Sequence, residues 1–286
     1  MKQAQLAINS VSTGGKDLEE RLAAYRSAGF ANVEFCLPHV MDYLKQGHSV
    51  GDARRLLDQF GLRCIGGFEG SVACFGDPAG NGSVIANAEL LAELGGSVLV
   101  VGTDGPQDVG AARDPLGRMA EVFAALARKV RATGVTLCIE FNWSPIVKSL
   151  RTAVEIARRS GASNVGVLFD PAHYHCTPTK FEMLTAESVP FIRHVHVDDM
   201  RDKPGELSHC NADRQLPGEG HLDLRMLFGA IERHGYRGYF SIEMFSDVLW
   251  AMPPTQAAKR MFDSLQPLCD EGAQAATTDA GQRNAH

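Results

Sequence analysis

The stretch FIRHVHVDDMRDKPGELSHCNADRQLPGEG, residues 191–220, opens as a strand and continues as a long loop rich in glycine and proline. In the strand, apolar residues alternate with His194, His196 and Asp198, so the two imidazoles and the carboxylate share one face. Burying such groups without partners costs on the order of a few kcal/mol each, so they must find hydrogen bonds or a metal ion. Arg214 lies just before the last turn of the loop. A polar strand end followed by such a loop is typical of a functional site.

The strand in this stretch is one of a series of short apolar runs separated by segments with helical spacing. The predicted strands are residues 5–9, 32–37, 63–69, 97–102, 136–141, 164–170, 192–199 and 238–245. The predicted helices are residues 18–29, 84–96, 116–133, 149–161 and 222–235, with a last one at about 255–269. Glycines just past most of these helices favour left-handed caps there. Eight such units at this length predict an α/β protein, a single-domain (β/α)₈ TIM barrel over residues 1–270, rather than a doubly wound open sheet.

The composition is ordinary for a globular protein, with 44% hydrophobic and 22% charged residues. A net charge of −6 argues against a general nucleic-acid or anionic-membrane surface. No apolar run approaches the roughly 20 residues of a membrane helix, and MKQAQLAINS lacks the apolar core of a signal peptide. Seven cysteines form no CxxC pair, which favours the reducing cytoplasm over a disulfide scaffold. We expect the small, polar segment 271–286 to be disordered.

Four polar residues fall at the ends of four successive predicted strands: Glu140, Asp170, His196 and Glu243. In a (β/α)₈ barrel the active site lies at these ends, so closure of the barrel should bring the four side chains around one point. Three carboxylates and one imidazole so close together repel one another unless a cation joins them. This mixed oxygen and nitrogen set suits one divalent ion, Mn²⁺, Zn²⁺, Co²⁺ or Mg²⁺. Taken singly, each residue could instead be a hydrogen-bonded polar group of the barrel interior.

Two further residues are candidates for contact with a substrate. His173 follows Asp170 by three residues, in the predicted loop after the sixth strand, where it could lean over the metal site and donate to a substrate oxygen. Arg214 could place its rigid donor fork over an anionic or enediolate oxygen. The alternatives, a loop histidine without a role and a solvated arginine, remain open.

Other polar residues near the strand ends have no assigned role. His194 lies two residues deeper than His196 on the same face, so we expect a buried, hydrogen-bonded role for it. Glu34 and Glu69 end the second and third strands and could line the pocket or pair with basic neighbours, while His175 could equally pack. A P-loop, a GxSxG motif and a correctly spaced GxGxxG motif are absent from the sequence.

Five segments carry a family resemblance: IEFN (139–142), VGVLFDPAHYH (165–175), HVHVDD (194–199), DRQLPGEGHLDL (213–224) and YFSIEMF (239–245). They resemble the xylose-isomerase-like family of sugar isomerases and epimerases, and within it the inosose isomerases most. The resemblance implies that Glu140, Asp170, His196 and Glu243 bind the metal. It also implies that Glu140 and Glu243 act as the acid/base pair, and that His173 and Arg214 contact the substrate. The related endonuclease IV group needs further histidines and a DRH motif, which this chain lacks.

We therefore expect a metal-dependent isomerase or epimerase that acts on a sugar or cyclitol ketone through a cis-enediolate. Two alternatives stay open at this point. One is a metal-dependent lyase of the 3-dehydroshikimate dehydratase type, and the other is a sugar-binding barrel without catalysis. The sequence leaves homo-oligomer formation open.

Overall fold

The computed structural model describes residues 1–269 except positions 107, 109, 111 and 143, and for Glu69 it describes the backbone alone. The expected disorder of residues 271–286 concerns a segment outside this described part. Of the helices that are described, none combines the length and apolar character needed to cross a bilayer.

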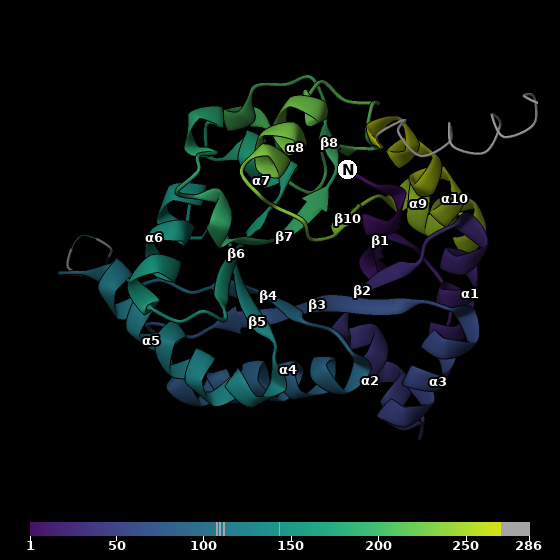
Figure 1. Ribbon diagram of the computed structural model, residues 1–286, viewed down its shortest axis with the longest axis horizontal. Coiled ribbons are helices and arrows are strands. Elements are labelled where there is room, and N and C mark those ends of the chain that lie inside the picture. Colours follow the sequence, from purple (N-terminus) through teal and green to yellow (C-terminus); the bar gives the residue numbers. More distant parts are fainter. Residues whose placement is uncertain (107, 109, 111, 143, 270–286) are drawn as a thin grey trace, which may run out of the picture.

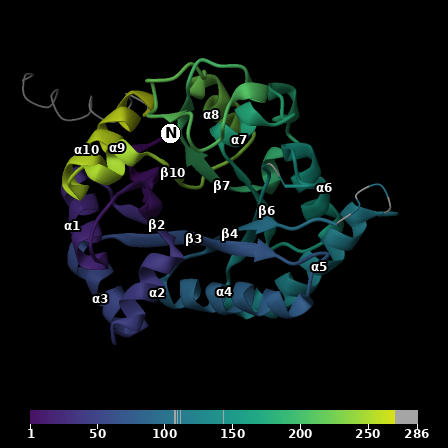
Figure 2. The ribbon, with the colours of Figure 1, turned by 180° about the vertical axis from the view of Figure 1, so that it is seen from behind.

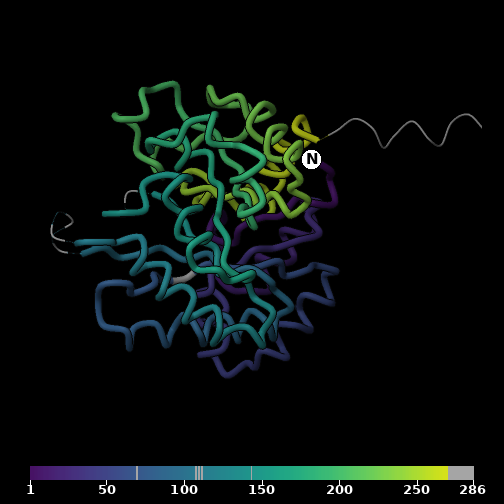
Figure 3. Tube along the Cα trace, turned by 60° about the vertical axis from the view of Figure 1, so that its left-hand side comes forward, coloured from purple at the N-terminus to yellow at the C-terminus, as the bar shows by residue number. Residues whose placement is uncertain are grey.

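Eight parallel strands close into a barrel in the order β1-β10-β7-β6-β5-β4-β3-β2, which confirms the predicted (β/α)₈ fold. The chain passes once around this barrel, so the first strand meets the last (Figure 3). The strands are β1 (Leu6–Asn9), β2 (Asn32–Cys36), β3 (Arg63–Val72), β4 (Val98–Thr103), β5 (Thr136–Glu140), β6 (Val165–Phe169), β7 (Ile192–Val197) and β10 (Phe240–Ile242). Two short antiparallel strands pair beyond β7, β8 (Asp199–Met200) and β9 (Arg214–Gln215); the predicted seventh strand ran on to residue 199, and the other three residues lie in the predicted loop.

Helices surround the strands (Figure 1), and in both ribbon views α1 and α10 lie side by side (Figure 2). The six predicted helices are found as α1 (Leu18–Ala28), α4 (Gly82–Leu94), α5 (Pro115–Val130), α6 (Leu150–Ser160), α8 (Leu224–Arg233) and α10 (Pro254–Leu265). Four more were not predicted: α2 (Leu37–Lys45), α3 (Val50–Phe60), α7 (Pro171–Cys176) and α9 (Asp247–Ala251). Gly29, Gly95 and Gly161 cap predicted helices in the left-handed conformation, as expected, and Gly61 caps α3 in the same way.

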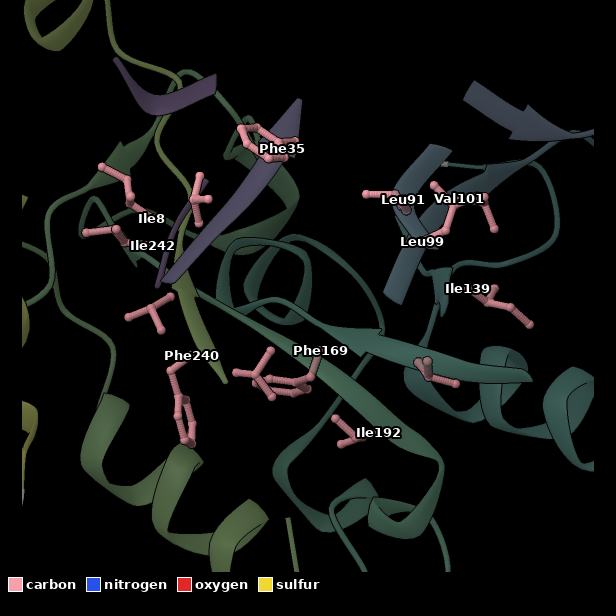
Figure 4. Packing of buried hydrophobic residues seen from close by; sticks show 14 of the residues in the cluster. Ile8, Phe35, Leu91, Leu99, Val101, Ile139, Phe169, Ile192, Phe240 and Ile242 are labelled. Carbon is pink, nitrogen blue, oxygen red and sulfur yellow. The ribbon is translucent and has the colours of Figure 1, made fainter. Parts of the chain in front are cut away.

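The apolar side chains of the barrel strands fall into two clusters because successive strand residues point to opposite faces. Leu99 and Val101 belong to the large cluster between strands and helices, where Figure 4 shows them beside Leu91. Their neighbours Val98 and Val100 pack in a separate small cluster with Cys138, Leu168 and Phe68. These apolar residues come from β3 to β6, whereas β2 and β7 carry buried polar residues at the corresponding positions. The barrel interior is therefore apolar on one side and polar on the other.

Candidate active site

The strand register brings the four predicted ligand residues to one end of the barrel. Glu140 is the last residue of β5, and Asp170 follows β6 directly. Phe169 pairs with Val195 and Ile242 pairs with Val197, so Asp170, His196 and Glu243 stand at neighbouring heights. The eighth barrel strand is shorter than predicted, so Glu243 lies one residue beyond it rather than within it.

His196 contacts two of the other three predicted ligands, Asp170 and Glu243. Its Nδ1 atom lies 3.2 Å from Asp170 Oδ2 and 3.2 Å from Glu243 Oε2. One ligand atom from each of the three residues lies within 4.8 Å of the others, and all three residues are buried. Two carboxylate oxygens and an imidazole nitrogen are a donor set that a divalent transition metal accepts, so these residues fit such an ion.

The fourth predicted ligand, Glu140, lies in the same cavity but outside this group of three. Its Oε1 atom accepts a hydrogen bond of 2.9 Å from His173 Nε2, and its Oε2 atom accepts one of 3.1 Å from Asn142 Nδ2. His173 Nε2 is also 3.8 Å from Asp170 Oδ2. His173 therefore links Glu140 to the group of three.

Asp170 and His173 owe their placement to a helix that the sequence analysis took for a loop. Asp170 is the N-cap of α7, where its Oδ1 atom accepts a 3.1 Å hydrogen bond from the His173 backbone N–H, and Pro171 occupies the first helical position. This cap leaves Asp170 Oδ2 directed at His196. The Asp-Pro pair is a known helix-start signal, so the sequence carried the information needed to predict α7.

Arg214 is buried rather than solvated, and it binds the carboxylates of the site. Its Nη2 atom lies 3.0 Å from Asp170 Oδ2, and its Nη1 atom lies 2.6 Å from Asp198 Oδ2 and 3.1 Å from Glu243 Oε2. Its Nε atom donates to the Cys210 carbonyl at 2.8 Å. The side chain still forms part of the cavity wall. The expected contact with substrate stays a prediction, but most of its donors already bind this chain.

Asp199 holds the Pro217–Gly220 turn beside the site. Its carboxylate accepts hydrogen bonds from the backbone N–H groups of Gly218, Gly220 and Leu222, at 3.1, 3.2 and 3.0 Å. A Cβ atom at Gly220 would lie 2.3 Å from Asp199 Oδ1, so this position requires glycine. The turn thereby fixes the chain segment that follows Arg214.

Beneath the site, Glu34 contacts both histidines of the β7 strand. Its Oε1 atom lies 3.2 Å from His196 Nε2, and its Oε2 atom lies 3.0 Å from His194 Nε2. All three side chains are buried. Burial opposes ionisation of Glu34, but the two imidazoles hold the pKa of its carboxyl well below the ordinary value. The prediction that Glu34 ends the second strand was wrong, because Glu34 is the third residue of β2 and points into the barrel interior toward β7.

The remaining candidates lie outside this cluster or outside the described side chains. His175 donates from Nε2 to the Lys203 carbonyl at 2.9 Å and does not line the cavity. Glu69 belongs to β3, and its side chain is not among those described. Asn9, which the sequence analysis missed, donates from Nδ2 to Glu243 Oε1 at 3.1 Å. It ends β1, so the rule that barrel sites lie at strand ends could have found it.

Burial and charge together set the ionisation of the site. Burial would raise the pKa of Asp170, but Arg214 and His173 hold it well below its usual value. Burial raises the pKa of Asp198 well above its usual value in spite of Arg214. Burial alone would lower the pKa of His173, but the carboxylates of Asp170 and Glu140 outweigh it and raise this pKa well above its ordinary value. The pKa of Glu140 is lowered in turn, because the effect of His173 outweighs that of burial. The carboxylates of Asp170 and Glu140 are therefore ionised, with Arg214 and His173 beside them.

The cavity above these residues measures about 510 Å³. Its ionisable lining consists of Glu140, His173, His196, Arg214 and Glu243. Uncharged hydrogen-bonding side chains complete the polar part of the lining: Ser71, Thr103, Asn142, Ser144 and Asn211. Phe68, Val100 and Phe245 form apolar walls. Among the described residues that line this cavity there is no lysine, so a negatively charged ligand would meet no uncommitted side-chain cation here.

Comparison with known proteins gives relatives of several activities. An inosose isomerase of Bacillus velezensis is 30% identical over 143 residues, which cover 49% of this chain and 50% of that protein. A 3-dehydroshikimate dehydratase of Pseudomonas aeruginosa is 28% identical over 267 residues, which cover 87% of this chain and 39% of that protein. The chain thus spans about half, or less, of the length of these relatives.

Solved structures share the fold. The crystal structure of the IOLI protein with a zinc atom superposes with a TM-score of 0.81 at 22% identity, covering 92% of this chain and 97% of that one. The model of the xylose isomerase-like TIM barrel family matches residues 22–268, which is most of the sequence. The barrel described above and this match agree, and the chain belongs to the xylose isomerase-like TIM barrel family.

Proposed function

We propose that the protein is a divalent-metal-dependent isomerase or epimerase that acts on an uncharged polyol ketone, either an inosose or a ketohexose. The observation that carries the proposal is the cavity itself. Two carboxylates, Glu140 and Glu243, lie in its wall beside His196, His173 and Arg214, and the uncharged polar lining groups are hydroxyls and amides. Such groups suit a ligand with many hydroxyls.

The residues that would hold the ion are Asp170, His196 and Glu243, joined by Glu140. A divalent ion there would supply positive charge that polarises a ketone oxygen. The low pKa of Glu140 keeps this carboxylate ionised, so it is able to accept the proton next to the ketone. Glu243, fixed by Asn9, would return a proton to the neighbouring carbon, or Glu140 would return it to the opposite face of the same carbon. His173, which donates to Glu140, would hold that carboxylate in place.

The charge of the cavity supports an uncharged substrate. Arg214 is already bound by Asp170, Asp198 and Glu243. A phosphate or carboxylate on the substrate would need a cation of its own to offset its lost hydration. Besides the proposed metal ligands, the described lining offers only Arg214 and His173, and His173 is already bound by Glu140.

A dehydratase is the second candidate, and the length of one alignment favours it. The 3-dehydroshikimate dehydratase matches over 87% of this chain, against 49% for the inosose isomerase. In that reaction the same carboxylate would remove a proton next to the ketone. The hydroxyl on the next carbon would then take up that proton from the carboxylate and leave as water, which gives a conjugated product that absorbs in the ultraviolet.

Proton exchange in D₂O separates the candidates. The protein loaded with Zn²⁺ or Mn²⁺ is incubated with a panel of inososes, ketohexoses and 3-dehydroshikimate, and each reaction is followed by NMR and absorbance. The proposal expects deuterium on one carbon next to the ketone of an uncharged substrate, with an isomeric product. An ultraviolet-absorbing product from 3-dehydroshikimate would establish the dehydratase instead. Ligand-induced stabilisation without turnover on any of these compounds would favour a binding protein and contradict the proposal.

A further inference from the structure

We propose that Glu34 is a positioning residue for the metal site, which fixes the orientation and tautomer of His196 so that Nδ1 is its ligand atom. This inference rests on the proposed metal-dependent function. The resemblance to known families assigned no role to Glu34. Glu34 lies in the middle of β2, which is far from β7 in the sequence, so its role is inferred from the geometry alone.

The two residues meet across the barrel interior. Glu34 lies on β2 and His196 lies on β7, and β1 and β10 stand between these strands in the barrel wall. Glu34 Oε1 is 3.2 Å from His196 Nε2, and both side chains are 1% exposed or less. On the opposite edge of the ring, Nδ1 is 3.2 Å from both Asp170 Oδ2 and Glu243 Oε2. The imidazole is therefore held between one carboxylate below and two at the cavity.

The chemistry of the imidazole turns this arrangement into a choice of ligand atom. A neutral imidazole has one N–H group and one lone pair, and an ionised carboxylate only accepts hydrogen bonds. Glu34 therefore places the N–H at Nε2, which leaves the lone pair at Nδ1, between Asp170 and Glu243. Histidines that bind metals commonly donate their other N–H to a carboxylate in this way.

Two other readings of Glu34 can be separated from this one. In the first, Glu34 only forms a buried pair with His194, whose Nε2 lies 3.0 Å from the second carboxylate oxygen. In the second, Glu34, His194 and His196 hold an ion of their own, since one ligand atom from each also lies within 4.8 Å of the others. The proposal expects one ion per chain, bound above His196, with an affinity that depends on Glu34 more than on His194.

The test measures binding of Zn²⁺ alone by titration calorimetry to the full chain and to the variants Glu34→Gln, Glu34→Asp and His194→Gln. We expect one ion per chain in the wild type and about 10- to 100-fold weaker binding in Glu34→Gln, the usual effect of losing such a partner. His194→Gln, the matched control, removes a neighbour of the same carboxylate and should bind Zn²⁺ close to wild-type affinity. Circular dichroism reports folding, and Glu34→Asp, which shortens the carboxylate, serves if Glu34→Gln does not fold.

A second measurement reads the tautomer directly. In ¹⁵N-labelled protein loaded with Zn²⁺, the His196 proton should reside on Nε2 and Nδ1 should carry the shift of a bound nitrogen. A proton on Nδ1, two ions per chain, or equal losses of affinity in Glu34→Gln and His194→Gln would each overturn the role of Glu34. Failure of the wild type to bind Zn²⁺ would instead refute the metal-dependent function on which the inference rests.

Discussion

Replacement of Arg214 by methionine should destabilise the metal-free protein strongly. Methionine keeps most of the apolar stem but removes the charge that Asp170, Asp198 and Glu243 share, and the contacts range from 2.6 to 3.1 Å. The arginine side chain is 1% exposed, so water cannot replace the lost partner. Breaking a buried ion pair by removal of one partner costs about 3–5 kcal/mol. We therefore expect Arg214→Met to lower the free energy of unfolding by about that amount.

Urea unfolding in the presence of a chelator measures this loss, and Arg260→Met is the matched control. Arg260 pairs with Glu219 at 3.0 Å, but both side chains are nearly half exposed. An exposed pair contributes between about 0 and 1 kcal/mol, so the control should unfold close to the wild type. An added divalent ion should restore part of the stability of Arg214→Met, by about 2.7 kcal/mol at one hundred times its Kd. Equal unfolding midpoints for the two variants would refute the view that Arg214 neutralises the buried carboxylates.

Three further predictions concern catalysis, acid stability and the loop. Glu140→Gln should lower kcat by about 10²-fold or more on the true substrate, because it removes the base. Replacement of an exposed residue, Glu93→Gln, is the control and should leave kcat unchanged. Wild-type turnover of Glu140→Gln in steady-state kinetics would exclude Glu140 as the base. Burial lowers the pKa of His39 to about 4 from 6.5, so the unfolded chain binds a proton between these pH values and the folded chain does not. The free energy of unfolding should therefore fall by up to about 3 kcal/mol as the pH is lowered from 6.5 to 4. Urea unfolding at each pH measures this fall, and His39→Gln should reduce it. An unchanged pH profile in His39→Gln would contradict the lowered pKa of His39. Gly220→Ala should weaken the turn held by Asp199, which limited proteolysis would detect as faster cleavage near the turn, and wild-type resistance would count against the clamp.

The sequence sufficed for the architecture because the barrel repeats a local rule. Each strand is an apolar run of limited length, and each helix has its own spacing and cap, so their order could be predicted without knowing what touches what. The same rule placed Glu140, Asp170 and His196 at strand ends. The register of a closed parallel barrel then brings equal heights together, which is why Asp170 and His196 meet as expected.

The partners of the site could not be predicted in the same way. Glu34 meets His196 only because β2 and β7 face each other across the interior, and no spacing in the sequence expresses that contact. Arg214 was expected to reach for a substrate, yet its loop folds into β9 and carries the guanidinium under three carboxylates. The helix α7 is a different case, because its Asp-Pro start signal was present and was passed over. The positions of Glu34 and Arg214 depend on tertiary contacts, whereas the start of α7 depends on a local sequence signal.

The central claim is that residues from the last four barrel strands hold a single divalent ion. Crystals of the full chain grown with Zn²⁺ and measured on both sides of the zinc absorption edge would test it directly. We expect one anomalous peak, about 2.0–2.2 Å from His196 Nδ1 and from carboxylate oxygens of Asp170 and Glu243, with Glu140 turned toward it. A zinc-saturated protein whose peak lies instead between Glu34 and His194, or away from the barrel mouth, would contradict it.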